Sequence, residues 1–178
     1  MKLQEKYKKE AIPGLKEKFG YKNDLAIPRI EKVTLNTGIG KFSQDEKAVE
    51  EIVKDLMMIS GQKPVFTLAK KAIAGFKIRQ GQKVGLAVTL RGQRANDFIE
   101  RLISLALPRS RDFRGLEQKS VDDHGNLNIG IKEQIIFPEI SHENIRNIFG
   151  LQITVKTTAK NHEEGLELFK LMGFPIKK

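Results

Sequence analysis

The sequence contains no cysteine and no long apolar run. Without cysteine, a disulfide bond or a thiolate metal site is impossible. Without about 18 consecutive apolar residues, a membrane-spanning helix is not expected. The first nine residues also lack the apolar segment of a secretory signal. These absences predict a cytoplasmic chain with no membrane partner.

Acidic residues are absent from the stretch between Gly61 and Gly92. The net charge of the chain is +10, and residues 61–120 alone hold 13 basic and 4 acidic residues, a balance of +9. Residues 1–60 contribute +2 and residues 121–178 contribute −1. A basic surplus concentrated in one third of the chain indicates a polyanionic partner, most simply a nucleic acid.

Alternation of apolar and polar residues predicts five β-strands. The expected strands are Ile30–Thr37, Pro64–Ala69, Lys83–Arg91, Asn126–Lys132 and Leu151–Thr158. Short connections and one-sided alternation favour an α+β fold, with a mostly antiparallel five-stranded sheet and helices packed on one face. A long basic loop joins the central strands. We expect a single domain over residues 1–178, with loop excursions near 70–83 and 108–125.

Helical spacing of apolar residues predicts helices around these strands. Two short N-terminal helices should break near Pro13, because proline clashes with the preceding helical turn. A capping box from Ser43 to Glu46 should open a helix that runs through Ser60. A third helix should end before Pro108, and a final helix should end at Gly173.

The predicted outward side of the strands carries no acidic and no aromatic residue. Its members are Lys32, Thr34, Asn36, Lys83, Gly85, Ala87, Thr89, Arg91, Asn126, Asn128, Gly130, Lys132, Gln152, Thr154, Lys156 and Thr158. A merely solvated face, the alternative interpretation, usually mixes both charge signs. Short polar groups on a smooth positive surface favour RNA, recognised through its shape, phosphates and 2′-hydroxyl groups.

The sequence gives little evidence for a catalytic site. The turn Gly38–Lys41 resembles a phosphate-binding loop, but its glycine spacing is wrong. The run Asp122–His124 lies in a predicted turn, and turn chemistry explains it better than a metal does. His142 and His162 each precede a glutamate without the spacing of a metalloprotease. We therefore expect no enzyme activity, no metal and no cofactor.

Several long motifs resemble the bacterial ribosomal large-subunit protein five. They are PRIEKVTLNTGIG at Pro28–Gly40, SGQKP at Ser60–Pro64, the run Ala69–Gly92, LPRSRDFRG at Leu107–Gly115, and the ending Gly173–Pro175. The resemblance covers essentially the whole chain. It implies a component of the central protuberance that binds 5S rRNA, helps attach it to 23S rRNA, and touches neighbouring large-subunit proteins.

The resemblance also implies roles for particular residues. Asn36, Gln62 and Thr89 are expected to hydrogen-bond to 5S rRNA, with Arg29, Lys32 and Lys63 on the same surface. The loop cations are expected to approach P-site tRNA; they are Lys70, Lys71, Lys77, Arg79 and Lys83. A bridge segment is expected to face small-subunit protein thirteen; its residues are Arg109, Arg111, Phe113 and Arg114.

Two other classes of function stay open on the residues alone. One is a free-standing RNA chaperone, which would not co-sediment with ribosomal subunits. The other is a phosphate-handling enzyme built on the Gly38–Lys41 turn, which would bind a nucleotide.

Overall fold

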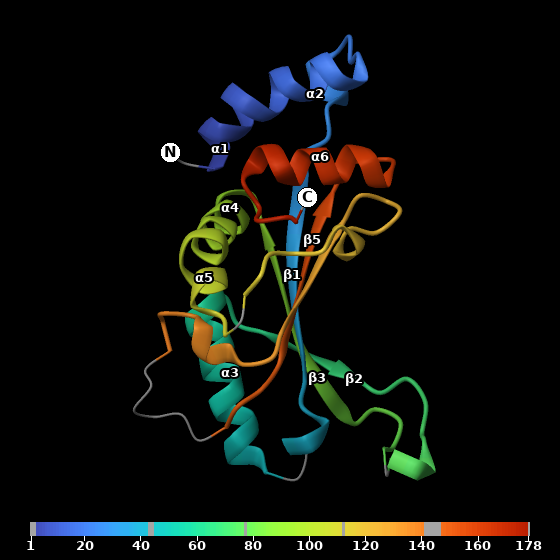
Figure 1. The fold of residues 1–178 in the computed structure, drawn as a ribbon. Coiled ribbons are helices and arrows are strands. Elements are labelled where there is room, and N and C mark those ends of the chain that lie inside the picture. The colour runs from blue at the N-terminus through green and yellow to red at the C-terminus, as the bar shows by residue number, and fades with distance from the viewer. Residues whose placement is uncertain (1–2, 43–44, 77, 112, 141–146, 178) are drawn as a thin grey trace. The chain divides into compact units, whose positions relative to one another are not determined.

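The computed structural model describes residues 3–42, 45–76, 78–111, 113–140 and 147–177. Its five strands form one sheet in the order β2-β3-β1-β5-β4 (Figure 1). The strands are β1 (Ile30–Gly38), β2 (Val65–Leu68), β3 (Lys83–Arg91), β4 (Leu127–Ile131) and β5 (Leu151–Thr157). Each of the five expected strands is present, and the predicted α+β class is confirmed.

The strand partners show that the sheet is antiparallel. Strand β2 pairs antiparallel with β3. Along β1 and β5, Arg29 bonds to Thr158 at one end and Thr37 bonds to Gly150 at the other. Residue numbers that rise on one strand and fall on its neighbour are the mark of antiparallel pairing.

In the described part of the chain, six α-helices lie before, between and after these strands. They are α1 (Leu3–Lys6), α2 (Ile12–Phe19), α3 (Glu46–Ser60), α4 (Gly92–Arg101), α5 (Leu107–Arg109) and α6 (His162–Met172). Short 3₁₀ turns occupy Asp24–Ala26, Gly40–Phe42, Ala74–Phe76, Gln118–Ser120 and Gln134–Ile136. None of the described helices is long and apolar enough to cross a membrane.

The chain forms two compact units. Unit one comprises Met1–Val33, Leu90–Ile129 and Thr154–Lys178, and unit two comprises Thr34–Thr89 and Gly130–Ile153. The core of unit one includes Leu15, Phe98, Leu168 and Phe169, and that of unit two includes Ile52, Leu56, Ile59 and Leu86. In unit one the N-terminal helical segment lies along α6, where Lys18 and Glu167 form an ion pair of 2.7 Å.

The two predicted helix breaks at proline are wrong, and both fail for one reason. A π-helical turn, Tyr7–Ala11, precedes Pro13, and a second one, Leu102–Ala106, precedes Pro108. A π turn bonds each N–H to the carbonyl five residues back, so it widens the helix where a proline ring would clash with the carbonyl four residues back. The helical path therefore continues through Pro13 to Phe19 and through Pro108 to Arg109.

Helix α3 begins and ends with specific caps. The Asp45 carboxylate accepts hydrogen bonds from the N–H groups of Lys47 and Ala48, at 3.0 and 3.2 Å. Asp45 is therefore the N-cap, whereas Ser43, the cap expected from the sequence, lies outside the described residues. Gly61 ends the helix with a positive φ of 66°.

Candidate nucleic-acid interface

Unit two presents a surface of small, uncharged side chains, which we name the open face. It consists of Thr34 and Asn36 on β1, Val65 and Thr67 on β2, and Gly85, Ala87 and Thr89 on β3. Leu35, Leu86 and Val88 alternate with them and are at most 2% exposed, so they form the opposite, core side. The two faces of β3 from Gly85 to Thr89 are as predicted.

Close approach of three strands explains the glycine at the centre of the open face. A Cβ atom on Gly85 would lie 2.6 Å from the Thr67 hydroxyl and 2.9 Å from the Thr37 carbonyl oxygen. The second of these is backbone and cannot move without disturbing the sheet. Gly85 therefore keeps the open face flat where β2, β3 and the end of β1 meet, and a flat surface lets a nucleic-acid backbone approach closely.

Asn36 and Thr89 share a property that a binding residue needs. Asn36 is exposed and Thr89 is half-buried. Among the residues that the structure describes, neither side chain has a hydrogen-bond partner. Their amide and hydroxyl groups are therefore available to a ligand.

The C-terminal end of α3 positions Gln62 and Lys63. The Ser60 hydroxyl donates to the Leu56 carbonyl oxygen at 2.6 Å and accepts the N–H of Gln62 at 3.2 Å. These bonds fix the backbone at Gln62, whose side chain is half-buried, while Lys63 is exposed. Asn36, Gln62, Lys63 and Thr89 all belong to unit two.

Lys83 does not follow the outward alternation expected of it. The pairing of β2 with β3 shifts register between Thr67 and Leu68, so that Leu68 lies opposite Lys83. The Lys83 ammonium lies 4.5 Å from the centre of the Phe66 ring. Both residues line a groove of about 590 Å³ against α3. Phe66 is paired with buried Leu86, so this groove lies on the core side of the strand and not on the open face.

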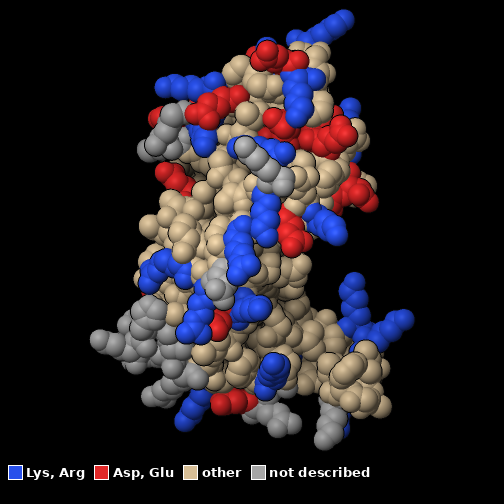
Figure 2. Space-filling model, in the orientation of Figure 1, with Lys and Arg blue, Asp and Glu red and all other residues tan. Residues whose placement is uncertain are grey.

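The connection between β2 and β3 is a hairpin with its own hydrogen bonds. Ala69 bonds to Gln82 and Gly81 through its backbone, and Ile73 pairs with Ile78. Lys70, Lys71 and Arg79 are exposed on it, whereas Lys77 lies outside the described residues. In Figure 2, basic side chains project at the lower right, where Figure 1 places this hairpin.

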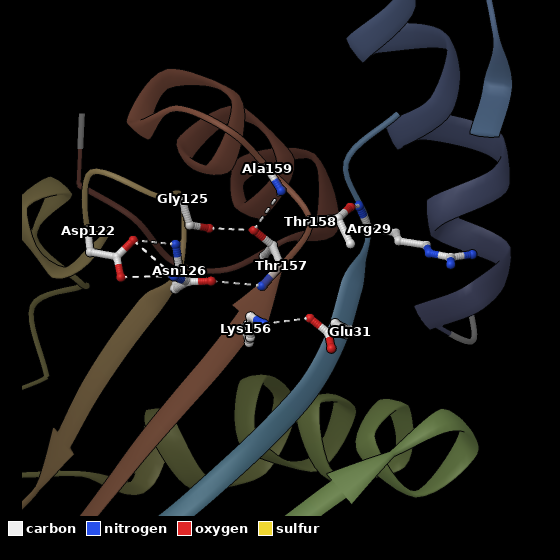
Figure 3. A network of polar contacts seen from close by, with 9 residues as sticks. All are labelled: Arg29, Glu31, Asp122, Gly125, Asn126, Lys156, Thr157, Thr158 and Ala159. Carbon is white, nitrogen blue, oxygen red and sulfur yellow. Dashed lines mark hydrogen bonds and ion pairs between the residues drawn. The ribbon is translucent and has the colours of Figure 1, made fainter. Parts of the chain in front are cut away.

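In unit one an acidic side chain lies where none was expected. Glu31 forms an ion pair of 3.0 Å with Lys156, a residue of the predicted acid-free face (Figure 3). The hydrogen bond from Lys156, with further attraction from Lys32 and Arg91, holds the pKa of Glu31 below its ordinary value. The prediction of a face free of acid is therefore wrong for unit one, because Glu31 neutralises Lys156 there.

Arg29 and Lys32 also belong to unit one. The backbone N–H of Arg29 donates to the Thr158 hydroxyl at 3.0 Å, while its side chain points away toward the N-terminal helical segment (Figure 3). Lys32 is half-buried beside Glu31.

Asn126 and Asn128, both predicted to face outward, are used inside the fold. Asn126 donates its side-chain N–H to the Asp122 carboxylate at 2.9 Å and accepts the N–H of Thr157 at 3.0 Å (Figure 3). Asn128 accepts the Thr154 hydroxyl at 2.7 Å. These amides are therefore not open to a ligand in the way that Asn36 is.

The Asp122–His124 run is a turn, as expected. Asp122 accepts the backbone N–H groups of His124 and Asn126. Burial opposes its charged form, but these bonds and the Asn126 side chain outweigh it and lower the pKa of Asp122. Among the described residues no group of three potential ligands could hold a metal ion, and His142 lies outside them.

Two glycines touch where this turn packs on α6. A Cβ atom on Gly165 would fall 2.6 Å from the Gly125 carbonyl oxygen, and one on Gly125 would fall 3.0 Å from the Asn161 carbonyl oxygen. Backbone thus packs on backbone, which brings the Gly125 carbonyl within 2.7 Å of the Thr157 hydroxyl that donates to it.

The predicted bridge segment follows α5 and is anchored at its far end. Arg109, Arg111 and Arg114 are exposed and Phe113 is half-buried. The N–H of Leu116 donates to the Pro175 carbonyl oxygen at 2.7 Å, and Lys177 returns a bond of 2.8 Å. This clasp holds the end of the segment without using its arginines.

Comparison with known proteins points to one family. The family model of ribosomal protein L5 matches residues 23–79, and the model of the C-terminal part of that family matches residues 83–176. A protein of Colwellia psychrerythraea is 52% identical over 99% of this chain and 98% of its own length, and one of Cupriavidus necator is 54% identical over the same shares. Both are named large ribosomal subunit protein uL5.

Proposed function

Because the chain belongs to the ribosomal protein L5 (uL5) family, we propose that it binds 5S rRNA through the open face of unit two. The chain is a structural, non-enzymatic constituent of the large subunit of the cytoplasmic ribosome. The whole chain, residues 1–178, would act as one ribosomal-protein domain that helps attach 5S rRNA to 23S rRNA.

One observation carries the 5S assignment. Asn36 and Thr89 lie on the same face as Gly85, where no side chain fits, and among the described residues neither has an internal hydrogen-bond partner. Uncharged donors and acceptors on a flat surface suit 2′-hydroxyl and phosphate oxygens of RNA. Gln62 and Lys63 of unit two are proposed as further 5S contacts. Arg29 and Lys32 of unit one are proposed to contact the same RNA.

The test is a binding titration of the purified chain with isolated 5S rRNA. Saturable binding that is lost in the Asn36→Ala, Thr89→Ala double variant would support the assignment. Retention of full affinity by that variant would overturn it, because the two side chains would then make no contact.

The hairpin between β2 and β3 is proposed to contact P-site tRNA. Its cations Lys70, Lys71 and Arg79 are exposed, and residues 69–83 contain no acidic side chain. Lys77 and Lys83 belong to the same proposed contact. Exposed charges act through screened attraction and position a phosphate backbone without reading its sequence.

The segment with Arg109, Arg111, Phe113 and Arg114 is proposed to form an intersubunit bridge with small-subunit protein thirteen. The backbone bonds at Leu116 support this role, because they hold the end of the segment without involving the side chains of Arg111 and Arg114. Replacing the three arginines with glutamine should weaken subunit joining and leave 5S affinity intact. Loss of 5S affinity in the purified system would place them on the 5S surface instead.

A further inference from the structure

Cationic, amide and aromatic groups from four elements line a pocket in unit one. Its volume is about 310 Å³. Its walls come from the N-terminal helical segment, the start of β1, α4 and the end of α6; the lining residues are Leu3, Gln4, Tyr7, Lys8, Arg29, Ile30, Asn96 and Met172. None of these lining residues is acidic.

We propose that this pocket binds one unstacked nucleotide of ribosomal RNA, with the phosphate on Lys8 and Arg29 and the base between Tyr7 and Asn96. The proposal rests on the proposed function only in taking RNA as the ligand. It gives Arg29, already proposed to contact RNA from unit one, a defined ligand that is separate from the contact proposed for the open face of unit two.

The cations of the pocket are available for a phosphate. Among the described residues, neither Lys8 nor Arg29 forms an ion pair, although the same N-terminal segment pairs Lys6 with Glu10 and Lys16 with Asp24. Arg29 is placed by its backbone, which bonds to Thr158 on the neighbouring strand. Its side chain is thereby directed toward the pocket, and a guanidinium suits the two oxygens of a phosphate.

The remaining groups suit a base. The Tyr7 hydroxyl donates to the Pro28 carbonyl oxygen at 3.1 Å, which fixes the ring. The Tyr7 phenol is neutral near pH 7 and does not repel a phosphate, because its ordinary pKa of 10.0 is already high and burial raises it further. Asn96 is half-buried, and among the described residues its amide has no hydrogen-bond partner. An amide of this kind can read the hydrogen-bonding edge of a base, while a ring supplies a stacking surface.

The volume of the pocket and the apolar residues at its base favour a single nucleotide over a duplex or an inorganic anion. The pocket is at the small end of the about 300–1,000 Å³ typical of ligand sites. Buried Leu3 and Met172, each at most 5% exposed, form an apolar floor that an inorganic anion would not use. Tyr7 also begins the π turn that accommodates Pro13, and such turns often occur at functional sites.

The first experiment titrates the ¹⁵N-labelled full chain with each of the four nucleoside 5′-monophosphates, followed by NMR. Saturable shifts should concentrate at Tyr7, Arg29 and the Asn96 side-chain amide. Arg29→Gln should weaken binding about tenfold or more. Lys119→Gln, which removes one exposed charge elsewhere in unit one, should change it less than about twofold.

Two further probes can overturn the proposal. Equal affinity for inorganic phosphate and for every nucleotide would reduce the pocket to an anion site. Tighter binding of an acidic Glu-Glu dipeptide would indicate a protein partner. Absence of saturable binding, or shifts scattered over the chain, would show that the pocket does not bind a nucleotide and would overturn the proposal.

The Asn96→Ala variant identifies which ribosomal RNA supplies the nucleotide, through its affinity for each isolated RNA. Weaker binding to isolated 5S rRNA identifies 5S as the source, and weaker binding to isolated 23S rRNA identifies 23S. No loss with either RNA overturns the proposal. The Asn36→Ala, Thr89→Ala variant should bind nucleoside monophosphates normally, so failure of the open face and failure of the pocket are distinguished.

Discussion

Asn36 in unit two and Asn128 in unit one are the same residue type on the outward side of a strand, yet they are not equivalent. Asn128 accepts the hydroxyl of Thr154 at 2.7 Å, whereas Asn36 has no side-chain partner among the described residues. The same contrast holds for Thr89 and Thr154. Outward polar residues can serve the fold or a ligand, and only their neighbours decide which.

Charge follows the same division. In unit one Lys156 is neutralised by Glu31 across the strands. In unit two the open face carries no charge, and the cations Lys70, Lys71 and Arg79 stand on the hairpin instead. Directional hydrogen bonds and long-range attraction are thus assigned to different parts of unit two.

The largest expected effect comes from removing the free polar groups. Asn36→Ala with Thr89→Ala should lower 5S rRNA affinity by about 100-fold, because each lost hydrogen bond costs about 1–2 kcal/mol. The salt dependence should stay unchanged, since no charge is removed. Affinity is measured by filter binding at several salt concentrations.

The matched control is Asn128→Ala with Thr154→Ala, which removes the same residue types from unit one. It should lower 5S affinity less than about threefold while lowering the melting temperature. Equal losses of affinity in the two double variants would show that both asparagine–threonine sets touch RNA, and the comparison would fail.

A second prediction concerns stability in unit one. Asn126→Ala removes a bond to Asp122 and leaves the N–H of Thr157 without its acceptor, which should cost about 2–3 kcal/mol of unfolding free energy in urea. Because the pKa of Asp122 is lowered in the fold, its stabilising contribution is present above the ordinary carboxyl range and is lost as pH falls through the folded pKa. The variant should show a shallower loss of stability in acid. An unchanged acid profile would mean that Asp122 is held without Asn126.

A smaller effect is expected from the hairpin cations. Glutamine at Lys70, Lys71 and Arg79 should leave 5S affinity within about threefold, yet speed tRNA dissociation from the P site of reconstituted ribosomes about fivefold. If 5S affinity and its salt slope fall together, the hairpin belongs to the 5S site.

The smallest effect should come from Glu31→Gln. Removing this carboxylate frees Lys156 from its ion pair, so RNA affinity should rise about twofold at low salt and return to the wild-type value in about 0.3 M salt. A rise that persists at high salt would indicate a rearrangement of β1 in place of a freed charge.

Local pattern was sufficient to predict much of the fold. Alternation predicted Lys83–Arg91 with the boundaries that the structure gives β3, and Gly61 and Gly173 end their helices where expected. These features depend on residues adjacent in sequence. Both helices continue past proline because a π turn precedes it, and the amino-acid preferences used to read the sequence do not predict such a turn.

The errors at the candidate interface arise from contacts between distant residues. A register shift places Lys83 beside Phe66, and Glu31 meets Lys156 across 125 positions of sequence. The pocket of unit one joins Tyr7 to Met172. Alternation describes the two faces of one strand. It contains no information on which side chain of a neighbouring strand will form a hydrogen bond or ion pair with a polar group.

The contact between Gly125 and Gly165 has a genetic consequence. Most packing defects can be relieved by a smaller residue on the opposing side, but here both partners already lack a side chain. Neither position therefore has a compensating substitution at the other. In a saturation screen for function, both sites should reject every replacement, and selection for suppressors of a Gly165→Ala allele should return true revertants or distant changes, never a second mutation at Gly125.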